Sequence, residues 1–285
     1  MLQLVFGVVM ISLSGVFVKL VDVDPTASAF YRMFFGGAVL AVITLVRRET
    51  LRLDARTLVF AVIAAAWFAG DLFVWHRSIL YVGPGLATLL ANFQVFLLAL
   101  AGILLYRERP GLRLLVAIPL AFAGLVLLVL PEWLSLGEDY RLGVILGLVT
   151  AVCYAGYTLT LRASRIGNST SSNFSNMAVL SLACAAILAP VTLAGGESFA
   201  IPGWQDFGWL VIYGVTAQLF GWVLISQSLP RLKASTVGLV LLLQPVSAFT
   251  WDFLLFDRQL ELIQFAGGVV ALVAIYLGTV RKREL

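Results

Sequence analysis

Long runs of apolar residues dominate this sequence, and they set the class of fold that the chain can adopt. The runs carry few charges and are separated by short polar or Gly/Pro-rich breaks. An α-helix crosses a hydrocarbon core about 30 Å thick with roughly 20 apolar residues, because its backbone polar groups are satisfied within the segment. Ten membrane-spanning helices are predicted, at residues 3–21, 27–46, 57–80, 83–105, 111–130, 140–162, 172–194, 206–229, 235–256 and 261–280.

The composition is that of a protein whose surface faces lipid. Of the 285 residues, 61% are hydrophobic and 12% are charged, whereas soluble domains carry about 25% charged residues. The apolar runs and their short loops use the length of the chain, so we expect no separate soluble domain. Cys153 and Cys184 lie inside apolar runs and are expected to be buried thiols. The predicted fold class is an all-α integral membrane protein.

Lysine and arginine are distributed unequally between alternate loops, which predicts the orientation of the chain. The loops after the second, fourth, sixth and eighth predicted helices, with the C-terminal residues, hold fourteen of them, and the opposite side holds four. Basic residues in short loops mark the cytoplasmic side. Both termini are therefore predicted to be cytoplasmic, in a bacterial-type cytoplasmic (inner) membrane. The net charge of +4 is thus assigned to a membrane face, and no nucleic-acid partner is expected.

A weak internal repeat divides the chain into two halves. Residues 85–109 align with residues 235–259 at a shift of 150 positions. Each half has five predicted helices, an odd number, so equivalent helices cross the membrane in opposite directions. Inverted repeats are typical of secondary transporters, in which two halves exchange conformations around a central site. We expect a five-helix repeat at 1–135 and an inverted five-helix repeat at 136–285, arranged around a central cavity.

Short motifs recur at the kinks and ends of the predicted helices. They are Ser14-Gly15-Val16-Phe17, Phe30-Tyr31-Arg32, Tyr81-Val82-Gly83-Pro84-Gly85-Leu86-Ala87 and Tyr106-Arg107-Glu108-Arg109, with partial repeats at Leu229-Pro230-Arg231-Leu232-Lys233-Ala234-Ser235 and Phe256-Asp257-Arg258. With these motifs the sequence resembles the drug/metabolite transporter (DMT) superfamily, specifically its EamA-type ten-helix exporters. The resemblance covers nearly the whole chain.

Within that superfamily the chain is similar to the YddG-type amino-acid exporters, which implies efflux of aromatic and other neutral amino acids. The resemblance also implies that the fifth and tenth helices stand at the periphery of the bundle. The chain departs from many relatives in two places: the first helix lacks a Trp-Gly pair, and Gln244-Pro245 stands where many relatives carry Glu-Pro. A glutamine amide does not titrate near neutral pH, so a proton-coupling role is not expected at this position.

Asp71 is a candidate for function because it lies inside a predicted helix. A charged side chain costs at least about 2.5–3.5 kcal/mol at the membrane centre, so such residues usually face a cavity or a partner. Asp71 could hold a substrate ammonium, or it could form an ion pair with Lys19 or Arg77.

Two further polar residues lie near the outer ends of their predicted helices. Arg32 could clamp a carboxylate with its two-pronged guanidinium, but a structural pair with Asp22 or Asp24 is favoured. His76 is the single histidine. Hydrogen bonding at the membrane interface is its favoured role, with pH sensing as the alternative.

Neutral polar and aromatic side chains form stripes on several predicted helices and carry the main substrate-binding prediction. A zwitterionic amino acid already carries both charges, so amides can satisfy its head while aromatic groups contact its side chain. The alternative is that these amides and hydroxyls only join helices. The predicted substrate-binding residues are Asn92, Gln218, Gln244, Trp67, Asp71, Tyr154, Tyr157, Trp222 and Trp251.

The sequence contains no motif for nucleotide hydrolysis, metal binding or nucleophilic catalysis. We therefore expect a protein that is not an enzyme and uses no cofactor or metal, with a small-molecule substrate and the lipid bilayer as partners; a monomer is sufficient. The leading prediction is a secondary transporter that exports amino acids or similar small metabolites by alternating access. The alternatives are a carrier for another small solute, such as a drug cation or a nucleotide sugar, and a channel.

Overall fold

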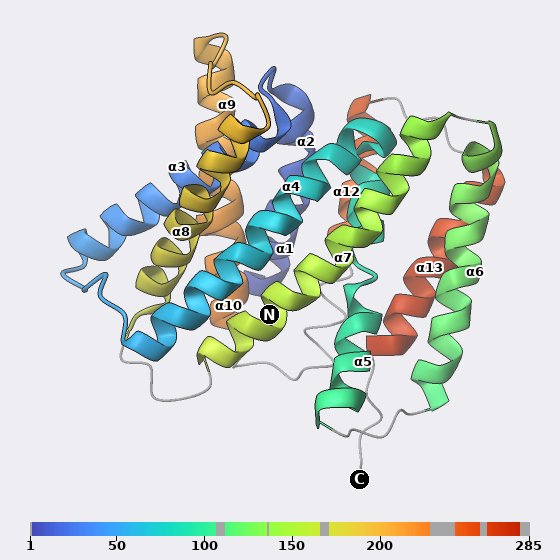
Figure 1. Ribbon diagram of the computed structural model, residues 1–285. Helices are drawn as coiled ribbons and strands as arrows, with labels where there is room; N and C mark the ends of the chain where they lie inside the picture. The colour runs from blue at the N-terminus through green and yellow to red at the C-terminus, as the bar shows by residue number, and fades with distance from the viewer. Residues whose placement is uncertain are drawn as a thin grey trace.

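A computed structural model describes residues 2–106, 112–135, 137–165, 171–228, 243–256 and 261–279, and all regular structure in these ranges is helical (Figure 1). Several sequence motifs lie outside the described residues, namely the charged segments 107–109 and 257–258, the motif 229–235 at the start of the ninth predicted helix, and the basic residues 281–283.

The helices follow the apolar runs of the sequence. They are α1 (Leu2–Ser12), α2 (Ser14–Leu20), α3 (Pro25–Val46), α4 (Ala55–Ala91), α5 (Gln94–Tyr106), α6 (Leu112–Ser135), α7 (Glu138–Arg165), α8 (Asn173–Ala194), α9 (Trp204–Gly214), the π-helix η1 (Val215–Val223), α10 (Leu224–Ser228), α12 (Leu243–Phe256) and α13 (Leu262–Thr279).

Within the described ranges, the length and apolar character of the helices indicate a multi-pass membrane protein. Six helical stretches are long and apolar enough to cross a membrane, at 2–20, 25–46, 55–98, 138–161, 173–194 and 204–227, and shorter apolar helices cover 115–127 and 262–274. Large apolar side chains are exposed along these helices, for example Val42, Phe122 and Leu193. Such a surface suits hydrocarbon and not water.

The longest stretch, residues 55–98, contains a reversal of the chain. Its 44 residues would extend about 66 Å as a straight helix at 1.5 Å per residue, roughly twice the thickness of a hydrocarbon core. Gly83 interrupts α4 with φ 81° and ψ 161°, a backbone conformation almost restricted to glycine. The chain turns back at this point (Figure 1), close to the predicted boundary between residues 57–80 and 83–105.

Two other predicted helices are also irregular. Residues 3–21 form α1 and α2 on either side of Leu13, and Gly15 in α2 packs so closely on Pro84 that an added Cβ would lie 2.4 Å from the Pro84 Cβ. Residues 206–229 were predicted as one helix, and the described part runs from α9 into α10 through η1. A π-helical segment is rare and is often found at a functional site.

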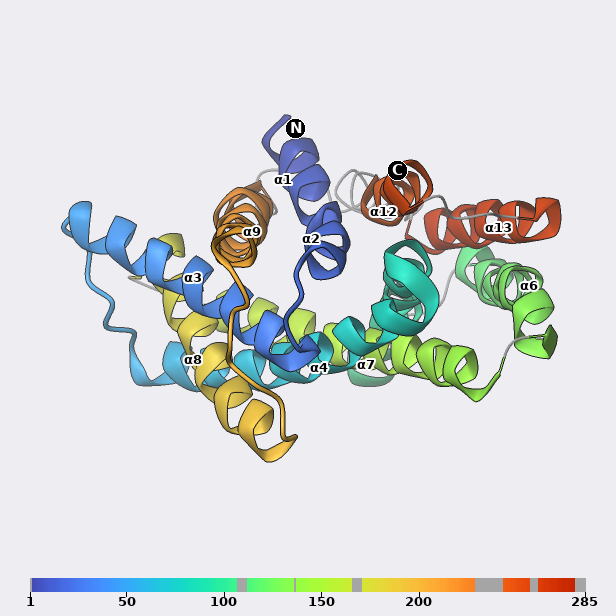
Figure 2. The same cartoon turned by 90° about the horizontal axis from the view of Figure 1, so that it is seen from above.

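The helices of the two predicted halves interleave in one bundle. α3 packs against α8 toward one side, α6 packs against α13 at the other, and α4 and α7 run together between them (Figure 2). α1 packs against η1 and α12. The pair α6 and α13, which correspond to the fifth and tenth predicted helices, thus stands at the edge of the bundle.

A backbone contact between α3 and α9 joins the halves near the centre. A Cβ added to Gly214 would lie 2.8 Å from both the Arg32 carbonyl oxygen and the Gly36 nitrogen, and one added to Gly36 would lie 2.7 Å from the Gly214 carbonyl oxygen. Small residues permit this approach, and close packing is a main source of helix association in lipid. The contact brings Arg32 of α3 next to Tyr213 at the end of α9.

We predict that Gly214→Ala destabilises the protein, because its methyl group would push against backbone atoms that cannot move independently. The expected cost is about 1–3 kcal/mol, as for other overpacked sites, measured as a lower unfolding midpoint of the purified protein in detergent. Gly208→Ala in the same helix is the control, because no atom lies within 4 Å of its added Cβ. Equal midpoints for the two variants would contradict the prediction.

Candidate functional site

A small cavity lies between the two predicted halves and collects most of the buried charge. Its volume is about 40 Å³, far below the roughly 300 Å³ at which ligand pockets begin, so the cavity is contracted in this conformation. The lining residues come from α1, α2, α3, α4, α7, η1 and α12. They are Ile11, Ser14, Arg32, Phe68, Asp71, Trp75, Thr88, Ala91, Thr150, Tyr154, Trp222 and Gln244.

A larger hollow of about 350 Å³ lies at the end of the bundle near the α2–α3 loop. The only charged residues that line it, Asp22 and Asp24, are exposed. Charges that remain in water need no special partner, so this hollow has no feature that selects a ligand. The smaller cavity, with its buried charges, is therefore the better candidate site.

A chain of hydrogen bonds fixes the buried guanidinium of Arg32. Arg32 Nη1 donates to the Tyr213 hydroxyl at 3.1 Å, and this hydroxyl lies 3.2 Å from His76 Nε2. His76 Nδ1 lies 2.8 Å from the Leu72 carbonyl oxygen. Because a carbonyl only accepts, Nδ1 carries a proton, and Tyr213 can donate to an unprotonated Nε2. The histidine is fully buried, which differs from the interfacial position favoured by the sequence.

Arg32 also does not form the structural ion pair that the sequence favoured. The backbone N–H of Asp22 donates to Asp206 Oδ1 at 3.0 Å, and Asp24 Oδ2 accepts from the Ser198 N–H at 2.8 Å. Arg32 instead lies near two aromatic rings, with Cζ 5.5 Å from the Phe68 centroid and 5.2 Å from that of Tyr213. Cations are attracted to such ring faces.

Asp71 lines the same cavity and is buried, with 6% of its surface exposed. The two cations that the sequence offered as partners lie elsewhere: Arg77 pairs with Glu197, and Lys19 Nζ lies 4.7 Å from the Phe256 ring centroid. Among the described residues, no cation lies within 4 Å of the Asp71 carboxylate, and its Oδ1 has no hydrogen-bond partner. The carboxylate is thus available to a ligand.

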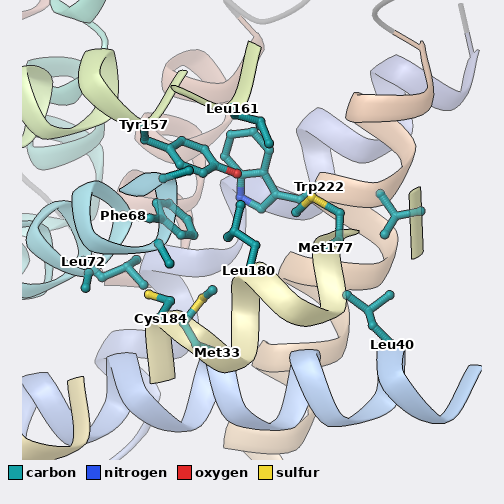
Figure 3. Packing of buried hydrophobic residues seen from close by; sticks show 14 of the residues in the cluster. Met33, Leu40, Phe68, Leu72, Tyr157, Leu161, Met177, Leu180, Cys184 and Trp222 are labelled. Atoms are coloured by element: carbon teal, nitrogen blue, oxygen red, sulfur yellow. The ribbon is translucent and has the colours of Figure 1, made fainter. Parts of the chain in front are cut away.

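Aromatic side chains form one wall of the cavity, and Phe68 of this wall also lies against Arg32. Phe68 stacks on Tyr157 with centroids 4.4 Å apart, and Trp222 lies edge-on to both (Figure 3). Tyr154 also packs edge-on against Trp222, at 6.0 Å. Offset and edge-to-face contacts stabilise such clusters, which gives the cavity a rigid apolar side.

The structure brings four of the nine predicted substrate-binding residues to the cavity, namely Asp71, Tyr154, Trp222 and Gln244. Tyr157 supports the aromatic wall from behind and is fully buried. The remaining predicted residues make other contacts.

Asn92 Nδ2 donates to the Thr88 carbonyl oxygen in its own helix at 2.7 Å. Gln218 is buried beside Met33 and Ser181, with Nε2 3.0 Å from the Met33 sulfur. Trp251 Nε1 donates to Ser12 Oγ at 2.9 Å. Trp67 is 40% exposed and lies over Gly156. These four side chains do not line the cavity in this conformation.

Hydrogen bonds from the start of α3 and from α4 to the loop before α9 join the halves at one end of the bundle. The Glu197 carboxylate accepts from the Thr26 N–H and from Thr26 Oγ1, both at 2.7 Å, and from Arg77 Nη2. Thr26 lies in the first turn of α3, where the helix dipole also favours a carboxylate. We call Asp24, Thr26, Arg77, Glu197 and Ser198 the latch, and it lies at the face predicted to be outside.

We predict that Glu197→Gln loosens the latch, because the neutral amide has one acceptor atom where the carboxylate has two. A cysteine at Ser14, which lines the cavity, should then react faster with a membrane-impermeant thiol reagent, in a background lacking Cys153 and Cys184. Loss of a hydrogen bond to a charged group gives a rate increase on the order of tenfold.

Glu49→Gln is the matched control, because Glu49 pairs with Arg47 in the α3–α4 loop at the opposite end of α3. Surface ion pairs contribute only about 0–1 kcal/mol, so labelling at Ser14 should stay at the wild-type rate. An unchanged rate in Glu197→Gln as well would show that the latch does not control access.

Comparison with known proteins agrees with a transport role for this geometry. The chain is 27% identical over 275 residues to an uncharacterized transporter of Archaeoglobus fulgidus, covering 96% of this chain and 94% of the relative. A solved structure described only as a crystal structure of a protein is 18% identical, with a TM-score of 0.68 over 98% of this chain and 96% of that one. This second match shows a shared fold.

The sequence profile of the EamA-like transporter family matches residues 1–130 and 141–280. These two ranges include nearly the whole chain and every residue of the cavity. The predicted resemblance to the EamA group of the drug/metabolite transporter superfamily is confirmed. The chain is a multi-pass membrane transporter, and not an enzyme, that belongs to the EamA-like transporter family.

Proposed function

We propose that the protein is a ten-helix secondary transporter that exports amino acids, aromatic and other neutral ones, or similar small metabolites. We place it in a bacterial-type cytoplasmic membrane with both termini in the cytoplasm, and we propose that it works by alternating access. The observation that carries the proposal is the cavity between the halves, which places the unpaired carboxylate of Asp71 beside an aromatic wall.

Helix pairing supports a five-helix repeat at 1–135 and an inverted five-helix repeat at 136–285. Under this repeat, α3 is equivalent to α8 and α6 to α13, and the members of each pair pack against each other. Such pairing is expected when a two-fold axis in the membrane plane relates the halves. The family profile also matches in two ranges separated near the proposed boundary.

The cavity offers both kinds of contact that an amino acid needs. The Asp71 carboxylate would accept hydrogen bonds from the ammonium, and the Gln244 amide can donate and accept. Tyr154 and Trp222 would contact the side chain of the substrate, with Tyr157 behind them. Asn92, Gln218, Trp67 and Trp251 have other contacts in this conformation, so they are not part of the proposed set.

The contracted cavity and the closed latch correspond to one state of the transport cycle. A cavity of about 40 Å³ has room for a few water molecules at most, at roughly 10–15 Å³ each. An amino acid would enter only after the helices around the cavity separate. With the latch closed at the face predicted to be outside, entry would occur from the cytoplasm, as export requires.

Topology reporters test the ten-helix arrangement. Fusion after Arg283 and insertion near Arg52 or Arg165 should report the cytoplasm, because these positions follow an even number of spans. Insertion near Glu138 should report the outside, since five spans precede it. Alkaline phosphatase and green fluorescent protein activities give the two readings, and the same side for Glu138 and Arg52 would refute the arrangement.

Flux into proteoliposomes tests the transport proposal. Purified protein should catalyse saturable uptake and counterflow of L-phenylalanine or another neutral amino acid, because a carrier alternates between two sides. Gln244→Ala should lower the apparent affinity about tenfold or more if its amide binds the charged head. Trp204→Ala is the control, because Trp204 is exposed at the start of α9.

The assay also separates the alternatives. Unsaturable flux without counterflow would indicate a channel. Counterflow of organic amines, but of no amino acid, would favour a drug-cation carrier, for which Asp71 and the aromatic wall are also suited.

A further inference from the structure

Several polar atoms around the cavity have no hydrogen-bond partner among the described residues. Four of these atoms are buried and belong to lining residues, namely Ser14 Oγ, Arg32 Nε, Asp71 Oδ1 and Trp222 Nε1. Buried polar groups are nearly always hydrogen-bonded. Their concentration around one cavity indicates that this site is built to receive a polar molecule.

Arg32 is the strongest donor in this set. It is 97% buried, since only 3% of its surface is exposed, and a guanidinium stays charged in proteins. Its Nη1 donates to Tyr213, while Nε remains unpartnered. The planar fork of N–H groups matches the two oxygens of a carboxylate, which forms short, charge-assisted hydrogen bonds with it.

The hydrogen-bond chain beyond Arg32 positions this group but does not neutralise it. Tyr213 accepts from Arg32 and can donate to His76, whose other nitrogen donates to the Leu72 carbonyl. Each member of this chain is neutral when the donors are assigned in this way. The rings of Phe68 and Tyr213 also lie near the guanidinium. The positive charge of Arg32 therefore has no negative partner within this series of hydrogen bonds.

Asp71 lines the same cavity with the opposite charge. No ion pair within 4 Å joins Asp71 to Arg32 among the described residues. A buried ion pair that only stabilises the fold requires direct contact and satisfied hydrogen bonds. Two separated opposite charges match a molecule that carries a carboxylate and an ammonium on the same carbon atom.

We propose that Arg32 binds the carboxylate of the substrate while Asp71 binds its ammonium, and that Tyr213 and His76 are positioning residues for Arg32. This inference rests on the proposed amino-acid transport and adds Arg32 to Asp71 and Gln244 in the recognition of the substrate head. Arg32 then selects α-amino acids over amines of the same shape, because only the amino acid offers it a carboxylate.

Ligand-dependent stability of the purified, full-length protein in detergent tests this assignment. The probes are L-phenylalanine, phenethylamine, which lacks the carboxylate, and phenylpropanoate, which lacks the ammonium. A ligand that binds only the folded protein raises the free energy of unfolding by RT ln(1 + L/Kd), where L is the free ligand concentration, so each apparent Kd follows from the rise of the unfolding midpoint with ligand concentration. The wild type should bind phenylalanine at least about tenfold more tightly than phenethylamine.

Arg32→Gln should raise the apparent Kd for phenylalanine by roughly ten- to a hundredfold and leave that for phenethylamine unchanged. Arg32→Lys keeps the charge without the fork, so its loss should be smaller. Arg56→Gln is the matched control, because Arg56 also lies over a ring, Phe60, but is exposed at the start of α4.

Tyr213→Phe keeps the assignment testable if Arg32 variants fail to fold, since it removes one hydroxyl and leaves the ring. As a positioning residue, Tyr213 should affect selectivity: its variant should weaken phenylalanine binding and leave phenethylamine binding unchanged. A purely structural role would weaken both ligands equally.

The outcomes are distinguishable. The assignment would be overturned if Arg32→Gln bound phenylalanine as tightly as the wild type, or if the wild type bound phenylalanine and phenethylamine equally well. Amino-acid transport would still be supported if the proteoliposomes showed amino-acid flux. If phenylpropanoate stabilises the wild type but phenylalanine does not, and Arg32→Gln loses this stabilisation, the amino-acid proposal fails and the carboxylate site is supported.

Discussion

The backbone contact between Gly36 and Gly214 is the constraint on which the rest of the structure depends. Because neither residue has a side chain, α3 and α9 approach closely enough for Arg32 to reach Tyr213 and for Gln218 to pack beside Met33. If α3 and α9 were farther apart at their crossing, the Arg32 guanidinium would not reach the Tyr213 hydroxyl. The same contact connects the two predicted halves, so a change in its angle would alter the cavity and the latch together.

The helical part of the fold was accessible from the sequence because lipid leaves few alternatives. The backbone of each span must form its hydrogen bonds within that span, so the length of an apolar run alone locates a helix. The predicted residues 27–46 and 172–194 accordingly differ little from the described α3 and α8. The irregular places were harder. The reversal at Gly83 was visible as a Gly-Pro pair, but the π-helix at 215–223, which packs against α1, α3 and α8, was not predicted.

The candidate site was predictable only in part, because residue type shows which groups need a partner and not which partner they find. Of the predicted substrate-binding residues, Asp71, Tyr154, Trp222 and Gln244 line the cavity, since a charge or a stripe of aromatic groups inside a span already suggests an inward face. Arg32 was assigned to the nearby acids because they are close in sequence. Its actual partner, Tyr213, lies 181 positions away, and only the fold brings the two together.

The reversal at Gly83 also has a consequence for the biosynthesis of the protein. A turn made by one glycine and the following proline leaves no loop in which a basic residue could fix the orientation of the flanking segments. We therefore expect these segments to enter the bilayer together, as a helical hairpin, with their direction set by the arginines that precede α4. On this expectation, a single residue that reverses the chain in the folded protein also couples the insertion of two segments at the translocon.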